Sequence, residues 1–221
     1  MQVFKVLNQD QLETIRKAFD ELDWKDGRDT ARGGAKKIKN NLQAYPTDPA
    51  FAPINEVVNQ IVFNSLVRTY VYAKNVVGLR ANSYSAGQTY GWHVDLSHMG
   101  KSRTDMSFTL FVSDPESYEG GELEMTSLGM SMKVKPKAGE MVIYPTGVLH
   151  QVAPVTSGIR LAVVGWIESF IADDEAREAL YKVAIARGLL NSHVNAKTEI
   201  TADNAEMVNE TYHQLIRILS S

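Results

Sequence analysis

Three side chains of this sequence have the types and the spacing of a metal site: His93, Asp95 and His150. His93 and Asp95 stand two residues apart within residues 90–96, a run with the character of a strand. Because side chains alternate along a strand, both are expected to point to one face. His150 begins a later predicted strand, so the fold could bring it to the same face as the third ligand.

This set of ligands has a definite chemistry. Two imidazoles and one carboxylate, without sulfur, leave up to three positions open on an octahedral ion, as in non-haem Fe(II) oxygenases. A closed structural zinc site could not bind a co-substrate and O2 together. Since the His-x-Asp pattern is short, the competing interpretation is that these are hydrogen-bonded polar residues of the core or loops. The other histidines are expected in packing or at the surface: His98, His193 and His213.

Arg160 follows His150 by ten residues, within the apolar run Gly158–Val163. If Arg160 lies on the hairpin partner of the strand that carries His150, its guanidinium reaches the same cavity. A buried arginine is costly unless an anion pairs with it, and the guanidinium fork matches a carboxylate. A dicarboxylic keto acid could therefore chelate the metal at one end and meet Arg160 at the other. The alternative is a surface arginine on an edge strand.

The N-terminal part of the chain predicts a short strand and two helices that flank the site. Residues 2–7 alternate as a strand does, and Leu12–Leu22 carries apolar residues at helical spacing. Asn8 and Gln11 precede this helix in a capping-box pattern. A second helix is expected over residues 55–69, after a segment rich in proline. Together these elements form a helical flank.

The β core is expected over about residues 71–169. About eight short strands follow one another there, with turn signals roughly every 8–15 residues, which is typical of a sandwich, barrel or jelly roll. Val71–Leu79 and Arg80–Tyr84 are its first two predicted strands. Two helices follow the core, opening at Asp173 and at Thr201 or Asp203. We therefore divide the chain into a main domain at 1–171 and a C-terminal helical extension at 172–221.

Some residues near this core have two interpretations. Ser107 and Thr109 form a polar strand face, which fits a cavity wall or a solvated surface equally. Trp92 and Trp166 are expected to pack, although Trp92 could line the mouth of the site. The Gly-rich basic segment 25–41 is interpreted as a mobile surface loop, with a binding role left open.

Composition excludes several classes of function. The 221 residues carry a net charge of -3, which gives no basic bias toward nucleic acid. There is no cysteine, which excludes disulfides, thiolate zinc sites and iron–sulfur clusters. No signal peptide is apparent, and no apolar run approaches the ~20 residues of a membrane span. We expect a cytoplasmic protein with neither a membrane nor a nucleic-acid partner.

The sequence resembles a known family over about residues 33–171. Arg80–Asp95 is similar to the R-x-x-x-Y-x-x-G-x-x-Y-G-x-H-V-D block of PKHD-type (prolyl/lysyl hydroxylase-domain) hydroxylases. These belong to the dioxygenases that use Fe(II) and 2-oxoglutarate. The resemblance extends to further segments: Ile38–Asn41, Arg103–Asp105, Leu110–Pro115, Gly120–Leu123, Val155–Arg160 and Trp166–Ile167. One departure is Gln151, where bacterial members usually carry arginine after the histidine.

The resemblance implies a double-stranded β-helix, or jelly roll, with Fe(II) bound by the histidines and aspartate introduced above. It implies that Arg160 anchors 2-oxoglutarate and that Tyr84 hydrogen-bonds the same carboxylate, with Tyr90 as a neighbouring competitor. O2 is the co-substrate and ascorbate a candidate reductant. The implied reaction couples oxidative decarboxylation of 2-oxoglutarate to succinate with hydroxylation of a substrate.

The substrate implied is a prolyl or other amino-acid side chain, in a small molecule, peptide or protein. A homodimer through the C-terminal helices is a further expectation. Two non-enzymatic alternatives stay open at this point. One is a metal-binding β-barrel or interaction module, and the other is an interaction protein acting through the C-terminal helices, which truncation at Ile171 would test.

Overall fold

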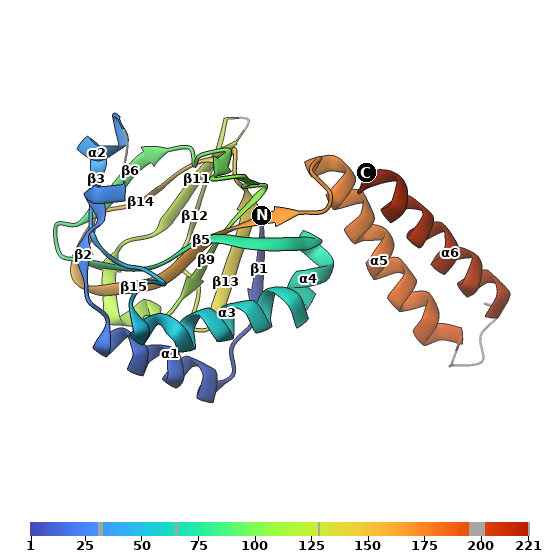
Figure 1. The fold of residues 1–221 in the computed structure, drawn as a ribbon, viewed down its shortest axis with the longest axis horizontal. Helices are drawn as coiled ribbons and strands as arrows, with labels where there is room; N and C mark the ends of the chain where they lie inside the picture. Colours follow the sequence, from blue (N-terminus) through green and yellow to red (C-terminus); the bar gives the residue numbers. More distant parts are fainter. Residues whose placement is uncertain (31–32, 65, 128, 195–201, 221) are drawn as a thin grey trace.

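The computed structural model describes residues 1–30, 33–64, 66–127, 129–194 and 202–220. Its centre consists of two antiparallel sheets (Figure 1). The larger sheet has eight strands, in the order β1-β13-β9-β15-β5-β4-β2 with β10 paired to β15, and the smaller has five, in the order β12-β11-β14-β6-β3. Strands β7 and β8 form a separate two-stranded sheet, from which Arg103 donates to the Ser169 carbonyl of β15. This arrangement confirms the predicted jelly-roll core with flanking helices.

The strands of the larger sheet are β1 (Gln2–Lys5), β2 (Lys25–Asp26), β4 (Leu42–Ala44), β5 (Ala73–Ser85), β9 (Met106–Phe111), β10 (Tyr118–Gly120), β13 (Glu140–Pro145) and β15 (Val155–Ser169). Those of the smaller sheet are β3 (Lys39–Asn40), β6 (Thr89–His93), β11 (Leu123–Ser127), β12 (Met130–Val134) and β14 (Leu149–Val152). The two-stranded sheet is made of β7 (His98–Met99) and β8 (Ser102–Arg103). Short 3₁₀ turns are η1 (Gly27–Thr30), η2 (Pro49–Phe51) and η3 (Pro115–Ser117).

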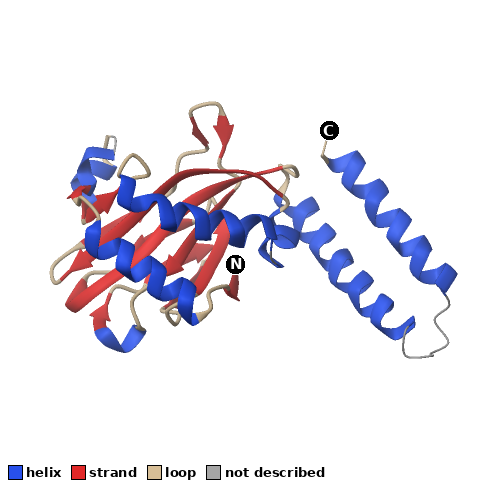
Figure 2. Ribbon diagram, turned by 60° about the horizontal axis from the view of Figure 1, so that its bottom comes forward, coloured by secondary structure: helices blue, strands red, loops and turns tan. Residues whose placement is uncertain are grey.

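Helices α1 (Gln9–Glu21) and α3 (Ala52–Asn64) lie across the outer face of the larger sheet (Figure 2). The predicted capping box is present: Asn8 accepts from the Gln11 backbone, and the Gln11 side chain accepts from the Asn8 backbone. Apolar side chains of both helices join those of β9 and β15 in one buried cluster. This packing buries the face of the larger sheet that points away from the cavity.

The helix expected over 55–69 corresponds to α3 and α4 (Leu66–Val71), with residue 65 outside the described residues. One predicted boundary was wrong because distant pairing decides it. The two strands expected before residue 85 form one strand, β5, although Gly78 within it has φ of +64°. Strand β15 pairs along β5 from Ile159 opposite Ser85 to Ser169 opposite Ala73, which carries the strand through the irregularity.

The C-terminal helices α5 (Asp174–Val194) and α6 (Ala202–Leu219) form a hairpin that projects from the core (Figure 1). Gly188, expected near the end of the first helix, lies inside α5. The predicted start at Thr201 lies outside the described residues. The Tyr72 and Tyr212 hydroxyls lie 2.9 Å apart and join α6 to the core.

At the base of the hairpin, the buried Arg177 guanidinium donates to the Ile171 carbonyl and lies 3.1 Å from the Met106 sulfur. Strand β15 ends at Ser169, so the domain boundary predicted at residue 171 falls between strand and hairpin and stays a prediction. Of the helices in the described part of the chain, none is long and apolar enough to cross a membrane.

Candidate active site

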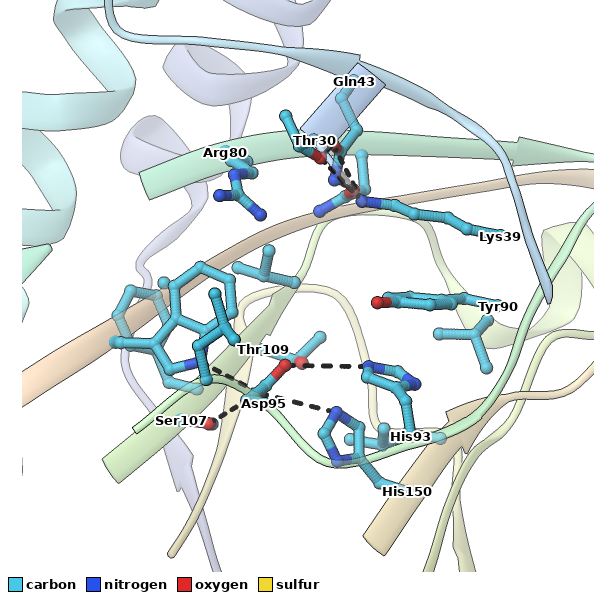
Figure 3. Close-up of a pocket in the computed structure, with 18 of the residues that line it drawn as sticks. Thr30, Lys39, Gln43, Arg80, Tyr90, His93, Asp95, Ser107, Thr109 and His150 are labelled. Atoms are coloured by element: carbon cyan, nitrogen blue, oxygen red, sulfur yellow. Dashed lines mark hydrogen bonds and ion pairs between the residues drawn. The ribbon is translucent and has the colours of Figure 1, made fainter. Parts of the chain in front are cut away.

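A cavity of about 150 Å³ lies between the two sheets and is lined by residues from both. His93 ends β6 and His150 lies in β14, and the two are direct cross-strand partners. The predicted strand 90–96 ends at His93, so Asp95 lies in the loop that follows it, contrary to expectation. Its carboxylate still faces the two imidazoles (Figure 3).

The three side chains offer ligand atoms that all lie within 4.8 Å of one another. Asp95 Oδ1 lies 3.7 Å from His93 Nε2, and Asp95 Oδ2 lies 3.6 Å from His150 Nε2. Two donors that each bind one ion at about 2.0–2.2 Å can stand at most about 4.4 Å apart. A single ion therefore fits between the carboxylate and each imidazole.

Hydrogen bonds orient both rings and place a proton on the Nδ1 atom of each. His93 Nδ1 donates to the Gly91 carbonyl at 2.7 Å, and His150 Nδ1 donates to the Val148 carbonyl at 2.9 Å. Since a carbonyl can only accept, the Nε2 lone pairs point at the carboxylate. Burial, and then the neighbouring His150, lower the pKa of His93 to about 4. His93 is thus neutral at pH 7, as a metal ligand must be.

Asp95 is held by two donors from the larger sheet. Ser107 Oγ and Trp166 Nε1 both donate to its Oδ2, each at 2.9 Å. The cavity-wall interpretation of Ser107 and Thr109 is therefore confirmed, since both are buried and line the cavity. Trp166, expected only to pack, also orients a ligand, and no signal in the sequence pointed to that contact. Trp92 is exposed by 42%.

Arg160 also reaches the cavity, but by another route than the one predicted. It lies on β15, which pairs with β5, β9 and β10, whereas His150 lies on β14 of the other sheet. The two strands are thus not hairpin partners, and they meet across the cavity. Arg160 is 1% exposed, and its Nε and Nη2 have no hydrogen-bond partner among the described residues. Its guanidinium carbon lies 4.9 Å from the Phe111 ring centre.

Both tyrosines proposed near the co-substrate line the cavity. Tyr84 is the cross-strand partner of Arg160, and its ring centre lies 5.4 Å from the guanidinium carbon. Tyr90 stacks on His93 with ring centres 3.6 Å apart. Burial raises the pKa of both, that of Tyr90 to about 12, so both hydroxyls keep their protons at neutral pH. Which hydroxyl bonds a co-substrate stays a prediction.

The sequence-based interpretation missed two cations in the lining of the cavity. Lys39 was assigned to a surface loop, yet it is 4% exposed and lines the cavity with Arg80. The segment 25–41 contains β2, β3, η1 and α2 (Ala35–Ile38), and β3 pairs with β6 so that Lys39 lies opposite Tyr90. The pairing of β3 with β6 could not be predicted from the glycine-rich composition of this segment.

Two of the remaining histidines, His98 and His213, are exposed, as expected, and neither is among the described residues that line the cavity. The His193 side chain lies outside the described part of the structure.

Comparison with known proteins identifies the family. Residues 79–168 match the 2OG-Fe(II) oxygenase superfamily. A PKHD-type hydroxylase of Prochlorococcus marinus is 38% identical over 202 residues, which cover 90% of this chain and 89% of that protein. The chain belongs to the PKHD-type hydroxylases. A second member, from Hyphomonas neptunium, is 42% identical over 183 residues, covering 80% of this chain and 82% of that protein.

Solved structures agree on the fold. A prolyl-4-hydroxylase of Pseudomonas putida covers 76% of this chain and 91% of its own length, with a TM-score of 0.52 at 20% identity. A prolyl hydroxylase of Trichoplax adhaerens, solved with a peptide fragment, covers 81% and 86%, with a TM-score of 0.57 at 12% identity. As a PKHD-type hydroxylase the protein is an oxidoreductase that uses Fe(II), 2-oxoglutarate and O2.

Proposed function

We propose that Fe(II) is bound by His93, Asp95 and His150, that 2-oxoglutarate is anchored by Arg160, and that the enzyme hydroxylates an amino-acid side chain. The observation that carries the proposal is the buried guanidinium of Arg160, which has no hydrogen-bond partner at Nε and Nη2 and belongs to a residue that lines the same cavity as the three ligands. A buried charge without an anion is costly, which supports an anionic co-substrate as its partner.

The residues present fit both groups. The Nδ1 hydrogen bonds leave the Nε2 lone pairs of His93 and His150 free for a metal, and Ser107 and Trp166 hold the carboxylate of Asp95 in place. Fe(II) with 2-oxoglutarate supplies the activation of O2, with succinate and CO2 as products. The buried walls exclude water, and Arg160 places the far carboxylate of the keto acid.

Further roles follow from the same arrangement. We expect Tyr84, whose ring centre lies 5.4 Å from the Arg160 guanidinium carbon, to donate to the carboxylate that Arg160 binds. Ascorbate would serve as the reductant that restores Fe(II). The names of related structures, which are prolyl hydroxylases, support a prolyl side chain as one candidate substrate.

The partner that we propose is a small molecule or a peptide, and the protein that binds it is soluble and cytoplasmic. Helices α5 and α6 form the surface for a homodimer.

The test is succinate formation from 2-oxoglutarate in variants of the ligands. We expect His93→Ala and Asp95→Ala to abolish it, because two ligands do not retain Fe(II). His98→Ala is the matched control, since this exposed histidine lies outside the cavity. Retained turnover in either ligand variant would contradict the proposal. Absence of a metal-to-ligand charge-transfer band on anaerobic titration with Fe(II) and 2-oxoglutarate would favour a binding module instead.

A further inference from the structure

Two cations face the three ligands across the cavity. Lys39, from β3 of the smaller sheet, and Arg80, from β5 of the larger sheet, lie at the end of the cavity away from His93, Asp95 and His150 (Figure 3). We call this end of the cavity the cationic wall. Arg80 stacks over Trp166, with its guanidinium carbon 5.1 Å from the ring centre, and Lys39 lies over Tyr90, with Nζ 5.0 Å from the ring centre. Both positive charges therefore border the space that a substrate must enter.

Neither cation has a carboxylate partner. Among the described residues, no acidic oxygen lies within 4.0 Å of Lys39 or Arg80. Asp95 is the only acidic residue in the described lining of the cavity, and its carboxylate faces the metal side. Lys39 Nζ donates to two neutral oxygens, Thr30 Oγ1 at 3.0 Å and Gln43 Oε1 at 3.1 Å.

The position of Lys39 is fixed by a buried amide network. Gln43 Nε2 donates to Asn82 Oδ1 at 2.6 Å, and Asn41 Nδ2 donates to the same oxygen at 2.9 Å. This leaves Gln43 Oε1 to accept from Lys39. An ammonium group has three N–H donors, so two are used and one remains for a ligand in the cavity.

Burial of Lys39 is costly without an anion. Desolvation, followed by the charge of Arg80, lowers the pKa of Lys39 to about 7. The two cations therefore act on each other, and an anion between them would relieve both the repulsion and the loss of hydration.

In the proposed active complex, neither Lys39 nor Arg80 is needed to balance the charge of iron and co-substrate. Fe(II), the Asp95 carboxylate, dianionic 2-oxoglutarate and the Arg160 guanidinium together carry no net charge. The positive charges of Lys39 and Arg80 are thus not needed by iron or co-substrate. They remain for the third component, the substrate.

We propose that Lys39 and Arg80 form the carboxylate-binding end of the substrate site, so that the substrate is a small molecule with a free carboxylate, such as an amino acid or a short peptide bound by its C-terminus. This inference rests on the proposed function. Tyr90 lies between Lys39 and His93, and its ring forms the wall along which the substrate runs from carboxylate to metal. The hydroxylated carbon then lies within a few bonds of the carboxylate.

The test uses the anaerobic Fe(II)·2-oxoglutarate complex of the full chain, which does not turn over. Its charge-transfer band is titrated with butyrate, benzoate and L-proline, and with their uncharged or cationic partners butyramide, benzamide and L-prolinamide. We expect at least one acid to shift the band saturably without abolishing it, and its amide to bind at least about ten-fold more weakly, which corresponds to about 1.4 kcal/mol.

Variants then locate the binding. Lys39→Met and Arg80→Met should each weaken the acid at least about ten-fold, and Arg80→Lys should recover part of the loss. Lys37→Met is the matched control, because Lys37 is exposed on α2 in the same basic segment. It should bind as the unmodified chain does.

Three outcomes would overturn the inference: acids that bind no better than amides, variants that bind acids as the unmodified chain does, or acids that only displace 2-oxoglutarate and abolish the band. If the band never forms before an acid is added, the proposed function itself fails. The two failures are thus distinguishable.

Discussion

The two ends of the cavity differ in the groups that support their charged side chains. On the metal side, the Asp95 carboxylate has its orientation set by Ser107 and Trp166, and its neighbours are two imidazoles whose Nε2 atoms face it. On the opposite side, Lys39 is supported by neutral oxygens only. Under the proposed function the first side binds a cation, and under the further inference the second side binds an anion.

The largest expected effect concerns Arg160, a third buried cation, which is expected to bind the co-substrate. Arg160→Met should raise the apparent KM for 2-oxoglutarate by roughly 30-fold to several thousand-fold, because loss of one partner of a buried charge pair costs about 2–5 kcal/mol. The same variant should raise the thermal stability of the ligand-free protein, since it removes a buried charge that lacks an anionic partner.

Arg16→Met is the control for this comparison. Arg16 pairs with the Asp114 carboxylate at 2.9 Å on the outside of the core, at 31% side-chain exposure. We expect no change in KM for this variant. An unchanged KM in Arg160→Met would remove its role as the anchor.

A smaller effect is expected from the support of the metal side. Trp166→Phe removes one of the two donors to Asp95 Oδ2 and should weaken Fe(II) or Co(II) binding by about 10–100-fold, as loss of such partners typically does. Metal affinity is measured by titration without 2-oxoglutarate. Trp92→Phe is the matched change at a tryptophan next to a ligand that makes no such bond, and it should leave the affinity as it is. Equal affinities in both variants would show that Asp95 needs no support from the larger sheet.

The smallest effect concerns stability and pH on the cationic wall. The pKa of Lys39 is about 7 in the folded protein and about 10.4 when unfolded, so between these values the unfolded chain binds more protons. Stability of the ligand-free protein should therefore rise with pH from this group, by about 1–2 kcal/mol between pH 7 and 9 relative to Lys39→Met. Arg80 lowers this pKa further, whereas Asp95 and Asp26 oppose the shift.

Urea denaturation of both proteins at several pH values measures the difference. Lys39→Met should be the more stable protein at pH 7, and its advantage should shrink toward pH 9. A constant difference would mean that Lys39 keeps its ordinary pKa and that the cationic wall carries no cost.

The same contrast explains how far sequence could predict the site. His93 and Asp95 are only two residues apart in the chain, so they lie close together although the strand ends earlier than predicted. His150 and Arg160 were placed correctly in the cavity although the route for Arg160 was wrong, because the argument from an unpaired buried charge does not depend on which strands pair. The β core and its flanking helices followed from local periodicity and capping.

The cationic wall could not be predicted, because its geometry depends on distant contacts. Lys39 is buried only because β3 joins the edge of β6 and because Gln43 is oriented by Asn82 from β5. Arg80 was visible as part of a family motif, but its place over Trp166 comes from the pairing of β5 with β15. Neither contact leaves a pattern in composition or periodicity.

The contact of Arg177 with the core has a consequence for any shortened form of the protein. Arg177 belongs to the first turn of α5, and it caps the Ile171 carbonyl and touches Met106, the residue before Ser107. A chain cut after Ile171 would expose Met106 at the start of β9. The next residue of that strand, Ser107, donates a hydrogen bond to Asp95. Weakened iron binding in such a fragment would then be explained by fraying of β9. The Arg177→Met variant of the full chain keeps the hairpin but loses the contact, so it separates this fraying from the loss of a partner that binds to the hairpin.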